Sequence, residues 1–158
     1  MTGYVVGFMF IEPYSYESQV LLIKKERPEW QKGKLNGIGG HIEKDETAED
    51  AMVREFEEET GFKTDKKDWR RFCSVRGIKR EYILFFYVYI VKEKDREEVE
   101  NSIITTTDEE VEFYYVATLD HYDLIPNLKW LIPLALDKDE LDNYGYGIWL
   151  WRKLKNEQ

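Results

Sequence analysis

Apolar residues along the chain gather in short runs that predict β-strands. The runs are rich in β-branched and aromatic residues, which suit the surface of a pleated sheet. The longest run covers residues 82–91 and is almost continuously apolar, which favours a central strand buried on both faces. The segments that predict strands are Tyr4–Ile11, Gln19–Ile23, Trp69–Ile78, Glu81–Val91 and Val111–Thr118.

Residues Thr47–Thr60 predict a helix because their apolar positions recur at helical spacing. Thr47 suits the N-cap, with Asp50 three residues later in a variant of the capping box. Gly61 stands where a glycine commonly ends a helix. The apolar face comprises Ala48, Ala51, Met52 and Phe56.

A second helix is predicted over Asn127–Asp137, where Pro133 should kink or shorten it. The tail, residues 144–154, fits either a strand or a helical end. Strand-like segments outnumber helices and do not alternate strictly with them. This order favours an α+β fold or mixed-sheet sandwich over a doubly wound parallel sheet.

Length and charge narrow the class of protein. A chain of 158 residues with 42% hydrophobic and 35% charged residues suits one globular domain rather than a disordered segment. The 23 Lys and Arg residues against 32 Asp and Glu residues give a net charge of −9. We therefore expect no binding of double-stranded nucleic acid, which needs a basic surface, and any phosphate substrate should arrive with cations.

Other features favour a cytoplasmic protein. Cys73 is the single cysteine, so no intrachain disulfide can form, which fits a reducing compartment. The longest apolar run is too short to cross a bilayer as a helix. The first residues lack the basic segment of a secretory signal. We expect a cytoplasmic protein without a membrane partner.

The most informative residues lie late in the first predicted helix. Glu55, Glu58 and Glu59 share one helical face, and Glu57 adds a further negative charge. Like charges at this spacing repel, and the carboxyl end of a helix disfavours anions. A solvated helix face is the common explanation of such a cluster. A hard divalent cation, Mg²⁺ or Mn²⁺, is the alternative.

The residues around the cluster favour the cation. Gly39 and Gly40 precede the helix, where glycine lets the backbone approach a ligand or metal closely. Arg54 stands next to Glu55 and can hold a carboxylate with two hydrogen bonds. These neighbours therefore favour a bound divalent cation over a solvated helix face, and such a cation often works through substrate phosphates.

From Gly40 to Phe62 the chain resembles the Nudix box. The pattern is glycine, five residues, glutamate, seven residues, and then Arg-Glu-apolar-x-Glu-Glu-x-Gly-apolar. All of its seven fixed residues are present over a span of 23 residues. They are Gly40, Glu46, Arg54, Glu55, Glu58, Glu59 and Gly61, with Phe56 and Phe62 at the apolar positions.

This resemblance implies a Nudix-type α/β/α sandwich with a mixed β-sheet, and residues 1–158 are expected to form a single Nudix hydrolase domain. The family hydrolyses nucleoside diphosphates linked to another moiety, with divalent cations. Arg54 would then orient the carboxylates, and Glu46 would brace the junction of loop and helix. The implied metal ligands are Glu55, Glu58 and Glu59, with the carbonyl of Gly39 as an extra ligand.

The general base differs between subfamilies, so several candidates remain. Some relatives carry a glutamate in a loop before a strand, and Glu110 stands before the strand that begins at Val111. Glu110 is our first candidate, with Glu58 and Glu59 as alternatives. An ordinary solvated loop residue is the competing interpretation of Glu110.

Flanking residues resemble the MutT-like, oxidised-purine nucleoside triphosphate diphosphatases. Residues 34–40 are similar to their W-N-G-F-G-G stretch, with Leu35 in place of Trp, so Asn36 would contact the base. Residues 124–134 are similar to W-P-D-D…W-F-P-L, which makes Asn127 and Trp130 candidate base-binding residues. Asn127 could instead cap a helix, and Trp130 could belong to the core.

The expected function is Mg²⁺-dependent conversion of a (d)NTP to a nucleoside monophosphate and pyrophosphate, by a monomer or homodimer. Lys25 is a candidate contact to a terminal phosphate, although a surface lysine is the alternative. Other enzyme substrates would be dinucleoside polyphosphates, nucleotide sugars or RNA 5′ ends. A catalytically inactive nucleotide-binding module is the alternative outside enzymes.

Overall fold

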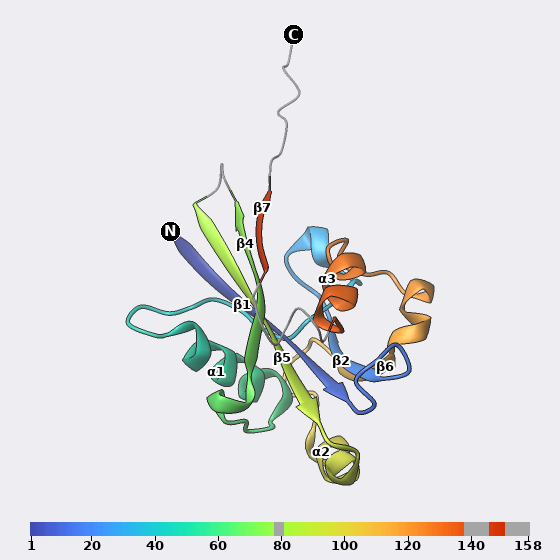
Figure 1. The fold of residues 1–158 in the computed structure, drawn as a ribbon. Coiled ribbons are helices and arrows are strands. Elements are labelled where there is room, and N and C mark those ends of the chain that lie inside the picture. Colours follow the sequence, from blue (N-terminus) through green and yellow to red (C-terminus); the bar gives the residue numbers. More distant parts are fainter. Residues whose placement is uncertain (78–80, 138–145, 151–158) are drawn as a thin grey trace.

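The two most apolar strands lie side by side in the middle of a sheet (Figure 1). The computed structural model describes residues 1–77, 81–137 and 146–150. Strands β1 (Thr2–Ile11) and β5 (Tyr82–Val91) are parallel and pair along the whole of their ten residues. Strand β5 lies between β1 and β4, so the prediction of a central strand is confirmed.

Within the described residues the sheet has seven strands in the order β3-β2-β1-β5-β4-β7, and β6 also pairs with β2. The β1–β5 and β4–β7 pairs are parallel, and the other pairs are antiparallel. The sheet is therefore mixed, as the resemblance implied. The remaining strands are β2 (Gln19–Lys24), β3 (Leu35–Asn36), β4 (Arg70–Gly77), β6 (Val111–Tyr115) and β7 (Tyr146–Leu150).

The predicted strands form with small shifts at their ends, and Ile78 of the predicted segment Trp69–Ile78 lies outside the described residues. The segment predicted over 111–118 leaves the sheet at Tyr115, because residues Val116–His121 turn into the 3₁₀ helix η4. Of the tail, residues 146–150 form a strand, and the rest of 144–154 lies outside the described residues. Strand β3 has only two residues, too few for a sequence pattern.

Helices cover both faces of the sheet. Helix α1 (Ala48–Thr60) lies on one side and α3 (Leu128–Ala135) on the other, which confirms the α/β/α layering (Figure 1). Helix α2 (Arg96–Ser102) follows the end of β5. The shorter 3₁₀ helices are η1 (Glu29–Gln31), η2 (Lys66–Asp68) and η3 (Glu93–Asp95). Among the described residues, no helix has the length and apolar character needed to cross a membrane.

Alternation along β1 builds a core on each side of the sheet, because successive side chains of a strand point to opposite faces. Val5 and Met9 pack in the cluster that contains Met52 and Phe56 of α1. Residues of the other parity, such as Phe8, pack in the cluster that contains α3. Burial of each such side chain contributes roughly 1.5–3 kcal/mol, so α1 is held firmly against the sheet.

The ends of α1 are fixed as the sequence predicts. The Thr47 hydroxyl accepts a hydrogen bond from the Asp50 N–H at 3.1 Å. Gly61 adopts a left-handed conformation with φ of 69°, and its N–H donates to the Glu57 carbonyl at 2.8 Å. In α3, Pro133 lies inside a helix of eight residues that ends at Ala135, which agrees with the predicted shortening.

Candidate active site

Arg54 is the centre of the hydrogen-bond network on α1. Its guanidinium donates to both Glu46 carboxylate oxygens, at 2.8 and 3.0 Å, and to Glu55 Oε1 at 2.9 Å. It also donates to Glu58 Oε2 at 3.2 Å and to the His41 carbonyl at 2.8 Å. The hydrogen bonds to Glu46 raise the pKa of Arg54 most strongly, although partial burial opposes the shift. Arg54 therefore ties three carboxylates and the glycine-rich segment together.

Glu46 joins the loop to the helix. Its Oε2 accepts a hydrogen bond from the Glu43 N–H at 2.9 Å, in addition to the bonds from Arg54. The Arg54 hydrogen bond lowers the pKa of Glu46, so this carboxylate is ionised over the physiological range. These contacts hold the segment before α1 against the middle of the helix.

Glu59 turns from α1 towards the glycine-rich segment. Its Oε2 accepts a hydrogen bond from the Gly39 N–H at 3.2 Å. Burial raises the pKa of Glu59 to about 7, against the lowering effect of Lys25. Burial also raises the pKa of Glu55, although Arg54 acts in the opposite direction. Two of the clustered carboxylates are thus partly withdrawn from water.

The two glycines make this close approach feasible. Gly39 has φ of 157°, and a Cβ atom there would lie 2.0 Å from the Val5 carbonyl oxygen. A Cβ at Gly40 would lie 2.5 Å from Glu55 Oε1. Any side chain at Gly39 would collide with backbone, and one at Gly40 would displace the Glu55 carboxylate.

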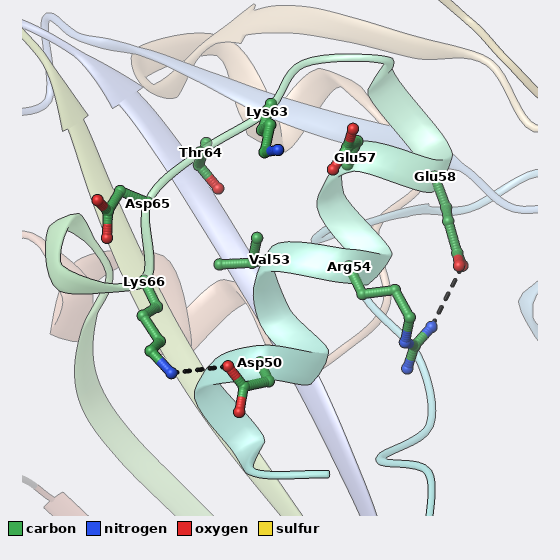
Figure 2. A pocket seen from close by; sticks show the side chains of 9 residues that line it. All are labelled: Asp50, Val53, Arg54, Glu57, Glu58, Lys63, Thr64, Asp65 and Lys66. Atoms are coloured by element: carbon green, nitrogen blue, oxygen red, sulfur yellow. Dashed lines mark hydrogen bonds and ion pairs between the residues drawn. The ribbon is translucent and has the colours of Figure 1, made fainter.

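Glu58 faces differently from Glu55 and Glu59. Its side chain is 58% exposed and borders a cavity of about 870 Å³ on the outer side of α1. Figure 2 shows Arg54 and Glu58 on one side of this cavity, and the Lys66–Asp50 ion pair on the other. The remaining lining residues are Val53, Glu57, Lys63, Thr64 and Asp65.

The donors on α1 fit a hard divalent cation by their chemistry, because carboxylate oxygens are the preferred ligands of Mg²⁺ and Mn²⁺. The half-buried Glu59 carboxylate accepts a hydrogen bond from the Gly39 N–H, and burial raises its pKa although Lys25 acts in the opposite direction. Within the described residues, no three acidic, His or Cys side chains yet converge on one point. Arg54 contacts one oxygen of Glu55 and one oxygen of Glu58, so it fixes the direction of both carboxylates.

The loop before β6 brings Glu109, rather than Glu110, to this region. Glu109 is only 5% exposed and accepts hydrogen bonds from Lys25 Nζ at 3.0 Å and the Glu26 N–H at 3.2 Å. Its charge also contributes to the raised pKa of Glu59, after burial and the charge of Glu55. Glu110 is exposed, and its carbonyl accepts from the Lys24 N–H at 2.8 Å.

Sequence reasoning therefore missed Glu109, although a signal for it exists. Val111 begins β6 and is buried, and Glu109 stands two residues before it. Since side chains two positions apart on an extended chain face the same way, Glu109 and not Glu110 shares the buried side. Lys25, predicted as a phosphate contact, pairs with this buried carboxylate and lies near Glu59.

The predicted base-binding residues come together in a cleft on the α3 face of the sheet. Asn36, Asn127 and Trp130 all line this cleft, whose volume of about 870 Å³ is within the range of ligand sites. The wall also contains aromatic side chains that the sequence alone did not point to. These are Tyr4, Trp30, Tyr82 and Phe86.

The structure bears on the alternative roles of Asn127 as a helix cap and of Trp130 as a core residue. Asn127 stands at the N-cap position of α3, but within the described residues its side chain makes no capping hydrogen bond. Its Oδ1 is buried and has no hydrogen-bond partner among the described residues. Trp130 packs partly against the core cluster and also lines the cleft, and its contact with a base stays a prediction.

Residues 36–41 connect the cleft to the carboxylates. At the cleft end, Asn36 Oδ1 accepts from the Gly37 N–H at 2.8 Å. Further along, Gly39 binds Glu59 through its N–H. The His41 ring then stacks at 4.4 Å on Tyr4, which also lines the cleft. A ligand with a base in the cleft could therefore direct its phosphates along this segment.

Comparison with known proteins agrees with this geometry. A family model described as the NUDIX domain matches residues 3–135. No curated protein matches the chain closely enough by sequence to count as a relative.

Three solved structures illustrate the similarity in fold. A MutT/nudix family protein from Enterococcus faecalis has a TM-score of 0.57 and 20% identity; the match covers 72% of this chain and 43% of that one. The NUDIX domain of Shewanella oneidensis NrtR, solved with ADP ribose, has a TM-score of 0.66, 18% identity and 84% coverage of both chains.

The third is a bifunctional NMN adenylyltransferase/ADP ribose pyrophosphatase from Francisella tularensis, solved with AMP and a manganese ion. It has a TM-score of 0.63 and 16% identity, and the match covers 87% of this chain and 41% of that one. The chain thus spans less than half of the Enterococcus and Francisella proteins.

Proposed function

The chain belongs to the NUDIX family of hydrolases, and from this premise we propose that it converts a (d)NTP to a nucleoside monophosphate and pyrophosphate with Mg²⁺ or Mn²⁺. The observation that carries the proposal is the segment 36–41, which begins in the cleft at Asn36 and reaches the carboxylates at Gly39. A base held in the cleft would place its phosphates beside Glu55 and Glu59.

The acidic residues of α1 would hold the cation that this reaction needs. Glu55, Glu58 and Glu59 would hold the cation, with the Gly39 carbonyl as a further ligand. When bound, the cation neutralises phosphate charge and favours ionisation of a water molecule. In the proposed reaction a water molecule would form a new bond to the α-phosphorus, and the bond from that phosphorus to the bridging oxygen would break, so that this oxygen leaves with pyrophosphate.

The proton of the attacking water needs an acceptor, and three groups compete for this role. Glu58 and Glu59 lie on the helix, whereas Glu109 reaches the site from the loop before β6. Glu110, our first candidate from the sequence, is exposed. Arg54 would act as a positioning residue, because it holds Glu55 and Glu58 in place before the ion binds.

Asn36 and Asn127 would read the edge of the base, because an amide offers both donors and acceptors. The buried Oδ1 of Asn127 supports this role, since an acceptor without a partner gains from a donor on a ligand. Trp130 and the other aromatic residues of the wall would pack against the plane of the base.

Pyrophosphate release from a mixture of dNTPs with Mg²⁺ tests the proposal. We expect release by the unmodified protein and a loss of roughly 100-fold or more in kcat for Glu58→Gln and Glu59→Gln. Glu57→Gln is the matched control, because Glu57 lies on the same helix, is exposed and stands outside the fixed positions of the box.

Other outcomes point to the alternative functions. Cleavage of ADP-ribose or dinucleoside polyphosphates in preference to every dNTP would overturn the proposed substrate class. Binding without turnover would favour an inactive nucleotide-binding module. We also propose that residues 1–158 form one domain, as a monomer or homodimer, in the cytoplasm; the single, buried Cys73 supports a reducing compartment.

A further inference from the structure

Three consecutive residues after β2 are tied to two consecutive residues before β6. Lys25 Nζ lies 2.8 Å from Glu109 Oε2, and the Glu26 N–H donates to the same oxygen at 3.2 Å. Arg27 forms an ion pair with Asp108 and lies 3.4 Å from Glu109. We call these five residues the clamp.

The segment that follows the clamp forms one wall of the cleft. Pro28, Trp30 and Gln31 all line it, and the Trp30 side chain is exposed to the extent of 63%. Pro28, Glu29 and Trp30 are exposed and Gln31 is half-buried, so this segment has little apolar burial to hold it. Polar contacts, rather than apolar packing, therefore hold this segment in place.

Three further contacts hold the base and the far end of this segment. The Gly33 N–H donates to the Lys25 carbonyl at 2.7 Å, and the Lys25 N–H donates to the Lys34 carbonyl at 2.9 Å. Asn36 Nδ2 also donates to Gln31 Oε1 at 3.3 Å. The loop is thus closed at its base, and the clamp ties that base to the loop before β6.

We propose that the clamp positions residues 28–31 so that Trp30 forms the outer wall of the cleft and packs against the base of the bound nucleotide. Trp30 is then a binding residue, whereas Arg27 and Asp108 are positioning residues. A large exposed indole at the mouth of a cleft lined by Tyr82 and Trp130 suits a flat aromatic ligand. This inference rests on the proposed function.

The test measures Kd for the α,β-methylene analogues of dATP and dGTP with Mg²⁺ by calorimetry, and KM and kcat for the hydrolysed dNTP. Trp30→Ala should raise Kd roughly tenfold, as loss of stacking on a base does in other proteins. Asp108→Asn should raise Kd and KM about threefold with kcat unchanged, because the wall must be ordered on binding. Arg27→Ala should raise Kd by the same factor.

A double-mutant cycle separates positioning from a direct contact. If Arg27 acts through Asp108, the double variant should bind no more weakly than either single variant. Lys67→Ala is the matched control, since Lys67 pairs with Asp65 on the exposed η2 segment, away from the cleft residues. The melting temperature should stay nearly constant, because exposed ion pairs add little stability.

The results distinguish the two proposals. Hydrolysis of dNTPs with unchanged Kd in Trp30→Ala, or additive effects of the Arg27 and Asp108 variants, would overturn the clamp alone. Failure of the unmodified protein to bind either analogue would overturn the proposed substrate class, and the clamp with it. Binding without hydrolysis would remove only the catalytic part of the proposed function, and the clamp would still be tested by Kd.

Discussion

The Gly39 N–H donates a hydrogen bond to Glu59 Oε2 at 3.2 Å, across 20 residues of sequence. This contact brings the end of α1 to the glycine-rich segment that passes β1. The same approach leaves a Cβ at Gly39 only 2.0 Å from the Val5 carbonyl. The backbone at Gly39 therefore sets where the Glu59 carboxylate can lie.

Gly39→Ala should lower the free energy of unfolding by roughly 1–3 kcal/mol or more, because the methyl group must displace backbone. Urea titration measures this loss, and pyrophosphate release should fall with it. Gly33→Ala is the control: φ there is 79°, but among the described residues no atom lies within 4 Å of the added Cβ. That variant should lose about 1 kcal/mol from backbone strain alone. Equal losses of unfolding free energy in the two variants would show that a side chain at Gly39 does not collide with the Val5 backbone.

Arg54→Ala should lower kcat by roughly 100-fold, because Glu55 and Glu58 lose the group that orients them. Arg54→Lys should recover little of this activity, since an ammonium group cannot reproduce the planar set of hydrogen bonds. Steady-state kinetics with Arg96→Ala, a variant at a half-buried position of α2 with its own ion pairs, provides the control. An unchanged kcat in Arg54→Ala would show that the carboxylates orient themselves.

The raised pKa of Glu59 predicts how stability changes with pH in the metal-free protein. Because burial raises this pKa from 4.5 to about 7, the stabilising contribution of protonated Glu59 is complete below pH 4.5 and disappears as the pH rises through 7. Relative to Glu59→Gln, the unmodified protein should lose roughly 2–3 kcal/mol over this window. Parallel stability curves for the two proteins would refute the shift.

Binding of Mg²⁺ should restore the stability that the protein loses when Glu59 ionises. The ion binds the ionised carboxylate, so added Mg²⁺ should raise the melting temperature more at pH 8 than at pH 5. Thermal denaturation with and without chelator measures the difference, and Glu59→Gln should show a smaller effect of Mg²⁺ at pH 8. An equal response at both pH values would place the ion elsewhere.

The effects of Glu109→Gln and Glu110→Gln on kcat distinguish the roles of the two loop glutamates. If Glu109 accepts the proton of the attacking water, kcat should fall by roughly 100-fold in Glu109→Gln and change less than about twofold in Glu110→Gln. The exposure of Glu110 and the burial of Glu109 beside Lys25 give the physical reason. The reverse order of effects would restore Glu110 as the base.

Asn36→Ala and Asn127→Ala should change the relative kcat/KM among dNTPs by about tenfold, because each removes an amide that lines the cleft proposed to hold the base. Competition between pairs of dNTPs in one reaction measures this preference directly. Asn101→Ala, at an exposed position of α2, should leave it unchanged. An unaltered preference in both cleft variants would remove these residues from base recognition.

The sequence alone determined the features that depend on the spacing of residues within one segment, namely helix α1 and the main strands. Helix α1, its Thr47 cap and its Gly61 end follow from local periodicity and capping. The helical repeat places Glu55, Glu58 and Glu59 within one turn, but the prediction of one shared face was wrong for Glu58, whose side chain is 58% exposed. Alternating and continuous apolar runs likewise identified the main strands, since burial on one or both faces leaves its period in the sequence.

Tertiary structure decided what depends on contacts between distant segments. Glu109 was missed because its burial arises where residues 25–27 meet residues 108–109, and Trp30 became a cleft residue only because η1 faces β5 and α3. Such pairings depend on loop closure and on packing of the whole sheet, which leave no regular period along the chain. The positions of the carboxylates along α1 therefore follow from the sequence of that segment. The shape of the cleft depends on how distant segments pack in the fold.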